Sequence, residues 1–136
     1  LDIVQAPFNV LDRRLICSGW AERLKINGTE IHVRSVFLQG LLLMQPAEVP
    51  SWFRLNWPKV FDQWFEFQKK VGLSADEISL GYALKQPLVD KVIVGVDNAA
   101  QLKRLLQIEC AKIADINLEL IAQDINLIDP SRWKLN

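Results

Sequence analysis

Short apolar segments typical of β-strands alternate along the chain with segments of helical periodicity, and this alternation constrains the fold more than any other feature. Strands are predicted at residues 1–6, 30–37 and 91–94. The last contains the run Val92-Ile93-Val94, which is too hydrophobic for a strand with one face in water and is typical of a strand covered on both faces by helices. Such strands between helices predict parallel βαβ units, and therefore an α/β fold.

Two helices with clear ends are predicted between the second and third strands. Pro58 fits the first turn of a helix, where its missing N–H loses no hydrogen bond, and Gly72 ends the same segment. Ser74 and Glu77 have the spacing of a capping box, which predicts the start of the next helix. Pro87 then stops that helix.

Further helices are predicted on either side of this pair. Ser18 is expected to cap a short helix that ends at the Asn27–Gly28 pair. Another helix begins near Asn98, and its side facing the core is predicted to consist of Leu102, Leu105, Leu106 and Cys110. An amphipathic segment is predicted at residues 113–121.

The 136 residues are expected to form one domain with two unusual parts. Residues 45–58 are predicted to be an irregular insertion, and residues 109–136 a helical C-terminal tail. The insertion has two interpretations: a loop packed by its own aromatic side chains, including Trp52 and Trp57, or a flap that faces a substrate.

Composition excludes several classes of function. The 16 basic and 16 acidic residues balance, and no basic stripe is present, which argues against a nucleic-acid partner. No apolar run approaches the roughly 18 residues of a membrane-spanning helix. Cys17 and Cys110 fit neither a disulfide framework nor a zinc pattern, so we expect no metal site and a cytoplasmic protein with free thiols.

The chain lacks the usual motifs of catalysis but has suggestive strand ends. His32 is the only histidine and lies within a predicted strand, and neither a P-loop nor G-x-G-x-x-G is present. In parallel α/β folds a ligand binds beyond the carboxyl ends of the strands, here residues 5–9, 34–40 and 95–101. Gly40 permits a sharp turn near the hydroxyl of Ser35, and Gly95 precedes a helix start, where unpaired N–H groups favour an anion. These two features together predict a phosphate-bearing ligand.

Three segments in register resemble the last three strands of the aldo-keto reductases. They are Val4-Gln5-Ala6-Pro7-Phe8-Asn9-Val10-Leu11-Asp12, the run from Val33 to Leu42, and Val92-Ile93-Val94-Gly95 with Gln101-Leu102 after it. The likeness extends from residue 1 to about 108, and residues 129–133 are similar to the tail of bacterial members. The resemblance implies a partial (β/α)8 TIM barrel, the C-terminal half with strands six to eight and their helices.

The resemblance also implies a nicotinamide cofactor, NADPH or NADH. Gln5 matches the glutamine on the nicotinamide carboxamide, and Arg34 the residue against the nicotinamide face. The loop around the pyrophosphate is matched by Ser35, Phe37, Leu38, Gln39 and Gly40, with Gly95 at the next strand end and Gln101 near the adenosine. The Ser, Lys and Arg residues that usually hold a 2′-phosphate in the family are not evident, and Val96 and Asp97 occupy their region. Asp97 would repel such a phosphate, whereas Arg104 would attract one, so the choice between NADPH and NADH stays open.

The catalytic Asp, Tyr, Lys and His of the family belong to earlier strands, so no catalytic residue is assigned here. Tyr82, the only tyrosine, is predicted to lie within a helix. Leucine at position 1 and a single methionine, Met44, suggest that the chain is part of a longer protein. That parent would reduce a small aldehyde or ketone by hydride transfer, whereas the isolated chain is expected to be inactive.

Two alternatives remain open from the residues. The chain can be a non-catalytic nucleotide-binding module, or an interaction module that contacts a partner through residues 52–57. We also expect the isolated chain to self-associate, because three strands of a barrel leave apolar surface and two sheet edges uncovered.

Overall fold

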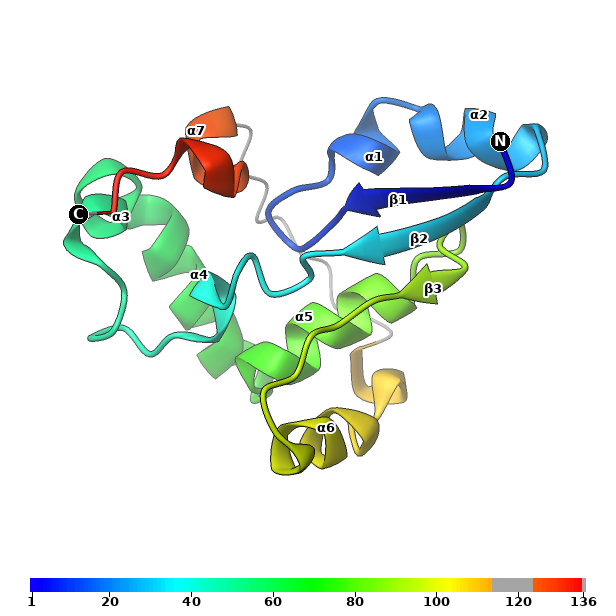
Figure 1. The fold of residues 1–136 in the computed structure, drawn as a ribbon. Coiled ribbons are helices and arrows are strands. Elements are labelled where there is room, and N and C mark those ends of the chain that lie inside the picture. Colours follow the sequence, from blue (N-terminus) through cyan, green and yellow to red (C-terminus); the bar gives the residue numbers. More distant parts are fainter. Residues whose placement is uncertain (114–123, 136) are drawn as a thin grey trace.

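The computed structural model describes residues 1–113 and 124–135 of the chain. Helices and strands alternate in the first part of the chain, and short helices follow in the tail (Figure 1). The elements are β1 (Ile3–Pro7), α1 (Arg14–Cys17), α2 (Trp20–Ile26), β2 (Glu30–Arg34), η1 (Leu41–Leu43), α3 (Ser51–Asn56), α4 (Pro58–Val71), α5 (Ala75–Leu84), β3 (Lys91–Val92), α6 (Ala99–Leu106), η2 (Cys110–Ile113), α7 (Ile125–Ile128) and η3 (Pro130–Arg132).

The strands form one parallel sheet in the order β1-β2-β3. Gln5 pairs with His32, which in turn pairs with Lys91. The predicted α/β class with parallel strands is therefore confirmed. All three carboxyl ends point toward the side of the molecule where the tail and α7 lie (Figure 1).

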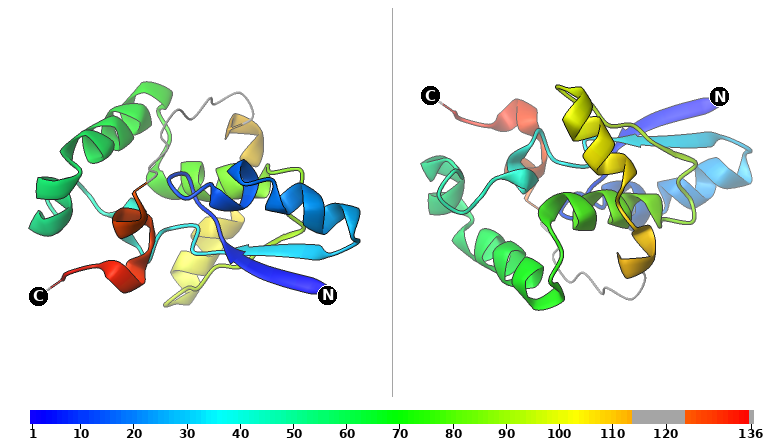
Figure 2. Two further views of the ribbon diagram at one scale, coloured as in Figure 1. Left: turned by 90° about the horizontal axis from the view of Figure 1, so that it is seen from above. Right: turned by 90° about the horizontal axis from the view of Figure 1, so that it is seen from below.

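The two faces of the sheet differ. On β2, Ile31 and Val33 are fully buried under α1, α2 and α5, whereas Arg34 is exposed and His32 only partly covered. Both views in Figure 2 show these helices on one side of the sheet. The prediction that residues 91–94 form a strand covered on both faces is wrong for the described part of the chain: β3 has two residues, and Ile93 is 39% exposed.

Most predicted helix ends are confirmed. Pro58 begins α4, and Gly72 ends it with a left-handed φ of 68°. Ser74 and Glu77 form the predicted capping box of α5. Ser18 does not cap α2: it follows the one-turn helix α1, and Gly19 takes the cap position with a φ of 76°.

The predicted apolar side of α6 is only partly buried. Leu105 is buried, but Leu102 and Leu106 are exposed, and α6 ends before Cys110. Among the described elements α6 packs against α5, at the margin of the molecule, so only one row of its side chains finds a covering surface. The amphipathic segment predicted at residues 113–121 lies, from residue 114 on, outside the described residues.

The larger of two apolar cores lies beyond the carboxyl ends of the strands. Trp64 of α4 is its largest fully buried side chain, and its indole N–H donates to the Leu42 carbonyl oxygen at 3.1 Å. The core draws on the loop after β2 and on α3, α4, α5 and α7. This placement matters for the site, because the loop that leaves β2 is anchored in a core of its own.

Residues 45–58 are not wholly irregular, since they include α3. Phe53 of α3 is buried in the larger core, and the Trp52 and Trp57 rings meet edge to face at 5.0 Å. These contacts favour the first interpretation of this segment, a loop packed by its own aromatic side chains. Within the residues that the structure describes, no helix has both the length and the apolar character needed to cross a membrane.

A polar cluster fastens α6 to the start of α5. The Arg104 guanidinium donates to Asp76 Oδ2 at 3.0 Å and to Ser74 Oγ at 2.9 Å, and it lies 3.8 Å from Glu77 Oε2. Partial burial raises the pKa of Asp76, but hydrogen bonds from Ser74 and Arg104 outweigh it and hold this pKa below 3.8. The ionised form of Asp76 is therefore the one that the fold favours.

This cluster predicts an acid dependence of stability. A carboxyl whose pKa is lower in the folded state stabilises the fold above its unfolded pKa, and this stability is lost as the pH falls through the folded pKa. We expect Asp76→Asn to lower the urea midpoint at pH 7 and to flatten its decline below about pH 4. Asp62→Asn, on the exposed side of α4, serves as the control. Parallel acid profiles for the two variants would contradict the role given to Asp76.

Candidate functional site

A groove of about 500 Å³ lies at the carboxyl ends of β2 and β3 and runs to the start of α6. It brings together most residues predicted to bind a cofactor: Arg34, Ser35, Phe37, Gln39, Gly40, Gly95 and Gln101. Val36, Leu43, Ile93, Val94, Val96 and Asp97 complete the lining. Two loops far apart in the sequence thus form a single concave surface, as expected for a parallel sheet.

The loop after β2 has an unusual backbone. Ser35, Leu38 and Gln39 have positive φ angles of 60°, 48° and 55°, and Gly40 follows with 83°. Left-handed conformations in residues other than glycine cost of order 1–3 kcal/mol each and persist only where the surroundings impose them. The positive φ of Ser35 also explains why β2 ends at Arg34 rather than at the predicted residue 37.

This backbone leaves several donors unused. The Leu38 N–H donates to the Ser35 carbonyl oxygen at 3.0 Å, which closes the turn. Within residues 1–113 and 124–135, the backbone N–H groups of residues 35–37, 39 and 40 donate no hydrogen bond. A turn with successive unpaired N–H groups forms a concave donor surface that suits a phosphate oxygen.

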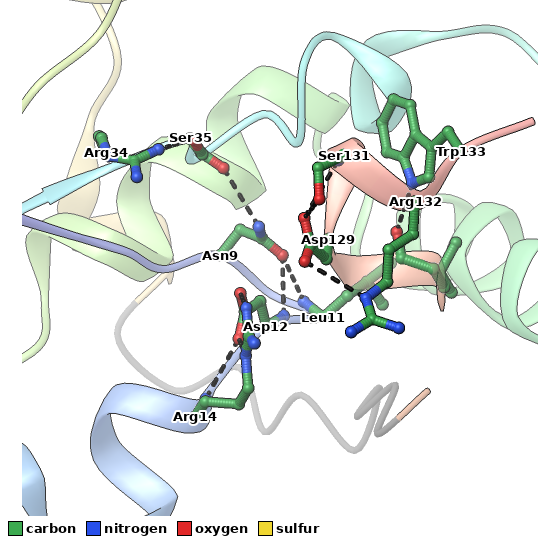
Figure 3. Close-up of polar contacts among 11 residues, drawn as sticks. Asn9, Leu11, Asp12, Arg14, Arg34, Ser35, Asp129, Ser131, Arg132 and Trp133 are labelled. Carbon is green, nitrogen blue, oxygen red and sulfur yellow. Dashed lines mark hydrogen bonds and ion pairs between the residues drawn. The ribbon is translucent and has the colours of Figure 1, made fainter. Parts of the chain in front are cut away.

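Asn9, in the loop after β1, holds the loop after β2 in place. Its side chain is fully buried, and Nδ2 donates to the Ser35 carbonyl oxygen at 3.1 Å (Figure 3). Asn9 Oδ1 accepts from the N–H groups of Leu11 and Asp12, both at 2.9 Å. The one amide therefore ties the β1 loop to the strained residue of the β2 loop. The sequence had shown Asn9 only as part of a strand end, without a signal for this contact.

An ion pair fixes the turn that follows Asn9. Asp12 is 1% exposed, and its two carboxylate oxygens accept from Arg14 Nε at 2.9 Å and Nη2 at 2.8 Å. A two-pronged contact of this kind orients both groups as well as neutralising the buried carboxylate. The hydrogen bond with Asp12 raises the pKa of the Arg14 guanidinium, which favours its charged form.

The far end of the groove is built at the start of α6. Asn98 Oδ1 accepts from the Gln101 N–H at 2.8 Å and so caps α6, the helix predicted to begin near Asn98. Gln101 Oε1 accepts from the Asp97 N–H at 2.7 Å, so this side chain also holds the preceding loop. Its amide NH2 group remains as the donor that Gln101 can offer to a ligand. The Asp97 side chain is exposed beside it.

Two predicted cofactor residues lie outside the groove lining. Leu38 is 1% exposed and packs in the larger core, and its N–H is already bound to Ser35, so the structure gives it an anchoring role. Gln5 is exposed at the middle of β1, in register with His32 on the open face of the sheet. Because Gln5 lies on β1, it is separated from the groove at the carboxyl ends of β2 and β3.

The open face around Gln5 carries a charged row. Glu30 Oε1 lies 2.7 Å from His32 Nε2 and 2.8 Å from Lys91 Nζ. The hydrogen bond from Lys91, followed by that from His32, holds the pKa of Glu30 below its ordinary value of 4.5. His32 thus has a carboxylate partner within the sheet, which agrees with the interpretation of His32 as a sheet residue.

A second hollow of about 240 Å³ shares Arg34, Ser35 and Gln39 with the groove. Its other wall comes from the tail, where Asp129 and Ser131 lie at the end of β1 (Figure 3). Asp129 Oδ1 accepts from the Ser131 N–H at 3.0 Å and from its hydroxyl at 2.7 Å. These bonds from Ser131 hold the pKa of Asp129 below 3.8. The sequence motif 129–133 is thus a turn that closes one side of this hollow.

Neither Tyr82 nor Arg104 lines the groove. Tyr82 lies in α5, as predicted, and stacks on Phe8 with 5.4 Å between ring centroids. Burial raises the pKa of its hydroxyl. Arg104 is bound to the start of α5, so its expected attraction for a phosphate in the groove is not supported by the structure.

Comparison with known proteins agrees with these features. The sequence model of the aldo/keto reductase family matches residues 1–126. The fold is similar to that of the aldo-keto reductase AKR11C1 from Bacillus halodurans in its apo and holo forms, each with a TM-score of 0.56 and 18% identity over 87% of this chain. The chain spans only 39% and 38% of those two chains. A search of curated proteins finds no match. Because the family match covers most of its length, the chain belongs to the aldo/keto reductase family.

Proposed function

We propose that this chain is the C-terminal part of an oxidoreductase that reduces aldehydes or ketones, and that its groove holds NADPH or NADH. The observation that carries the proposal is the turn at residues 35–40: most of its residues line a groove at the ends of two parallel strands, and among the described residues their N–H groups donate no hydrogen bond. Aldo-keto reductases generally use NAD(P)H, and the family match supports this cofactor class.

The residues present fit such a cofactor. The groove volume lies within the roughly 300–1,000 Å³ of small-molecule sites. The N–H groups of Gln39 and Gly40 suit the pyrophosphate, Arg34 offers a cation beside it, and the Gln101 amide offers a donor at the α6 end. When bound, the cofactor supplies the hydride, while this chain binds and orients it.

Other parts of the parent protein would complete the barrel and supply the catalytic acid. We assign β1, β2 and β3 to strands six, seven and eight, because their order and motifs follow the last three strands of the family. In this arrangement the open face with Gln5, Glu30 and His32 lines the barrel interior. The two free cysteines support a cytoplasmic location.

Nucleotide binding is tested most sharply by a pair of glycine variants. Gly40 in the groove and Gly72 at the end of α4 both have positive φ, and neither has an atom within 4 Å of an added Cβ. Alanine at either position should cost about 1–2 kcal/mol of stability through the same backbone strain. We expect Gly40→Ala to weaken NADH or NADPH binding about tenfold or more, and Gly72→Ala to leave binding unchanged.

Isothermal titration calorimetry measures both affinities. If both variants bind the nucleotide equally weakly, the loss reflects reduced stability of the fold rather than a change in the groove. If the unsubstituted chain binds neither nucleotide, the proposed function is refuted.

Catalysis should be absent from the isolated chain. Proton donation to the carbonyl needs a positioned acid, and Tyr82 is stacked in α5. We therefore expect no carbonyl-dependent oxidation of NADPH or NADH by the purified 136 residues, measured by nucleotide absorbance with a panel of aldehydes and ketones. Turnover that Ser35→Ala abolishes would contradict this expectation. Nucleotide binding without turnover in the full-length parent would instead favour a non-catalytic binding module.

Self-association is expected because β1 has no partner on its outer side in the described part of the chain. Ile3, on this edge, is 51% exposed. A lysine on an edge strand opposes pairing with a second edge, so Ile3→Lys should convert an associated chain toward monomer in sedimentation velocity. Ile26→Lys, at an 84% exposed position at the end of α2 rather than on a strand, is the control. A monomeric unsubstituted chain would disprove the expectation.

A further inference from the structure

The groove carries a marked asymmetry of charge. Among its lining residues Arg34 is the cation and Asp97 the carboxylate. Arg34 belongs to the end of β2, whereas Asp97 lies in the loop before α6, beside Gln101. Within the described residues the Asp97 carboxylate forms no ion pair, while its own N–H is fixed by Gln101 Oε1 at 2.7 Å. The negative charge is thus held beside the groove without a neutralising partner.

The cationic side chains closest in sequence to the α6 end of the groove do not line the groove. Arg104 donates to Asp76 and Ser74 on α5, and Lys103 does not line the groove. Residues 114–123 and 136 contain neither lysine nor arginine, so every cationic side chain that this sequence encodes is in the described part of the structure. The α6 end of the groove therefore receives no cation from this chain.

The second hollow indicates which end of a dinucleotide lies at α6. A carbonyl substrate needs space beside the nicotinamide, and the hollow of about 240 Å³ adjoins the groove through Arg34, Ser35 and Gln39. The pyrophosphate fits the N–H groups of Gln39 and Gly40, between the two ends. The nicotinamide then lies at the Arg34 end, and the adenosine ribose at the end that carries Asp97.

These charges have opposite consequences for the two nicotinamide cofactors. NADP differs from NAD by a phosphate on the adenosine ribose, with roughly −1.5 to −2 charges near pH 7. A carboxylate repels that phosphate but accepts a hydrogen bond from a free 2′-hydroxyl, as the acidic residue of other dinucleotide sites does. At a separation of about 4–6 Å near a solvated surface, this repulsion amounts to about a tenfold difference in affinity.

We propose that Asp97 makes the groove selective for NADH over NADPH, with Arg104 withheld from the site by Asp76. The inference rests on the proposed function, because it requires that the groove bind a nicotinamide dinucleotide. It deepens that function by naming the cofactor and the residue that selects it.

The test compares dissociation constants for NADH and NADPH by calorimetry on the full chain. We expect NADH to bind about tenfold more tightly than NADPH. Asp97→Asn should reduce this ratio to less than about threefold, mainly by strengthening NADPH binding, and Asp97→Arg should reverse the preference. Glu66→Gln removes an exposed carboxylate of α4 outside the groove and should leave the ratio unchanged. Circular dichroism confirms that each variant is folded.

Ionic strength supplies a second readout. Because the discrimination is a repulsion between charges, added salt should narrow the ratio in the unsubstituted chain and have little effect on it in Asp97→Asn. Equal binding of both nucleotides, tighter binding of NADPH, or an unchanged ratio in Asp97→Asn would overturn the selectivity and leave the proposed function standing. Failure to bind either nucleotide would instead refute the proposed function itself.

Discussion

The hydrogen bond from Asn9 to the Ser35 carbonyl oxygen is the contact on which the site depends. Ser35 is the residue at which β2 stops being a strand, and its positive φ directs the chain into the turn that leaves N–H groups unpaired. That conformation is unfavourable by itself. It is maintained because a buried amide, fixed in turn by two N–H groups of its own loop, holds the carbonyl in place.

The turn also depends on apolar packing on its other side. Leu38, within the left-handed stretch, is buried in the larger core together with Leu41 and Leu42 of η1. Trp64 reaches this core from α4 and donates to the Leu42 carbonyl oxygen. A hydrogen bond from the loop after β1 and apolar packing that includes α4 therefore hold the loop after β2 from its two sides, which explains how three non-glycine residues persist in a costly conformation.

The local sequence rules predicted where helices begin and end more reliably than they predicted which side chains meet in the fold. The proline at the start of α4, the glycine at its end and the capping box of α5 act within one turn of chain, and each is found as expected. The exposure of Leu102 and Leu106 depends on which neighbours α6 meets, and periodicity carries no information about neighbours. The hydrogen-bond partners of Asn9 and Arg104 were equally impossible to predict, because both partners lie more than 25 residues away in the sequence.

The parts that shape the groove lie within one continuous stretch of polypeptide. The brace at Asn9, the turn at Ser35, the anchor at Trp64 and the cap at Asn98 all precede residue 100, and their partners also belong to the first 101 residues of this chain. Such a segment has the properties of a transferable unit in gene fusion. Joined to different preceding strands, it would carry along this groove, with the cation of Arg34 at one end and the carboxylate of Asp97 at the other.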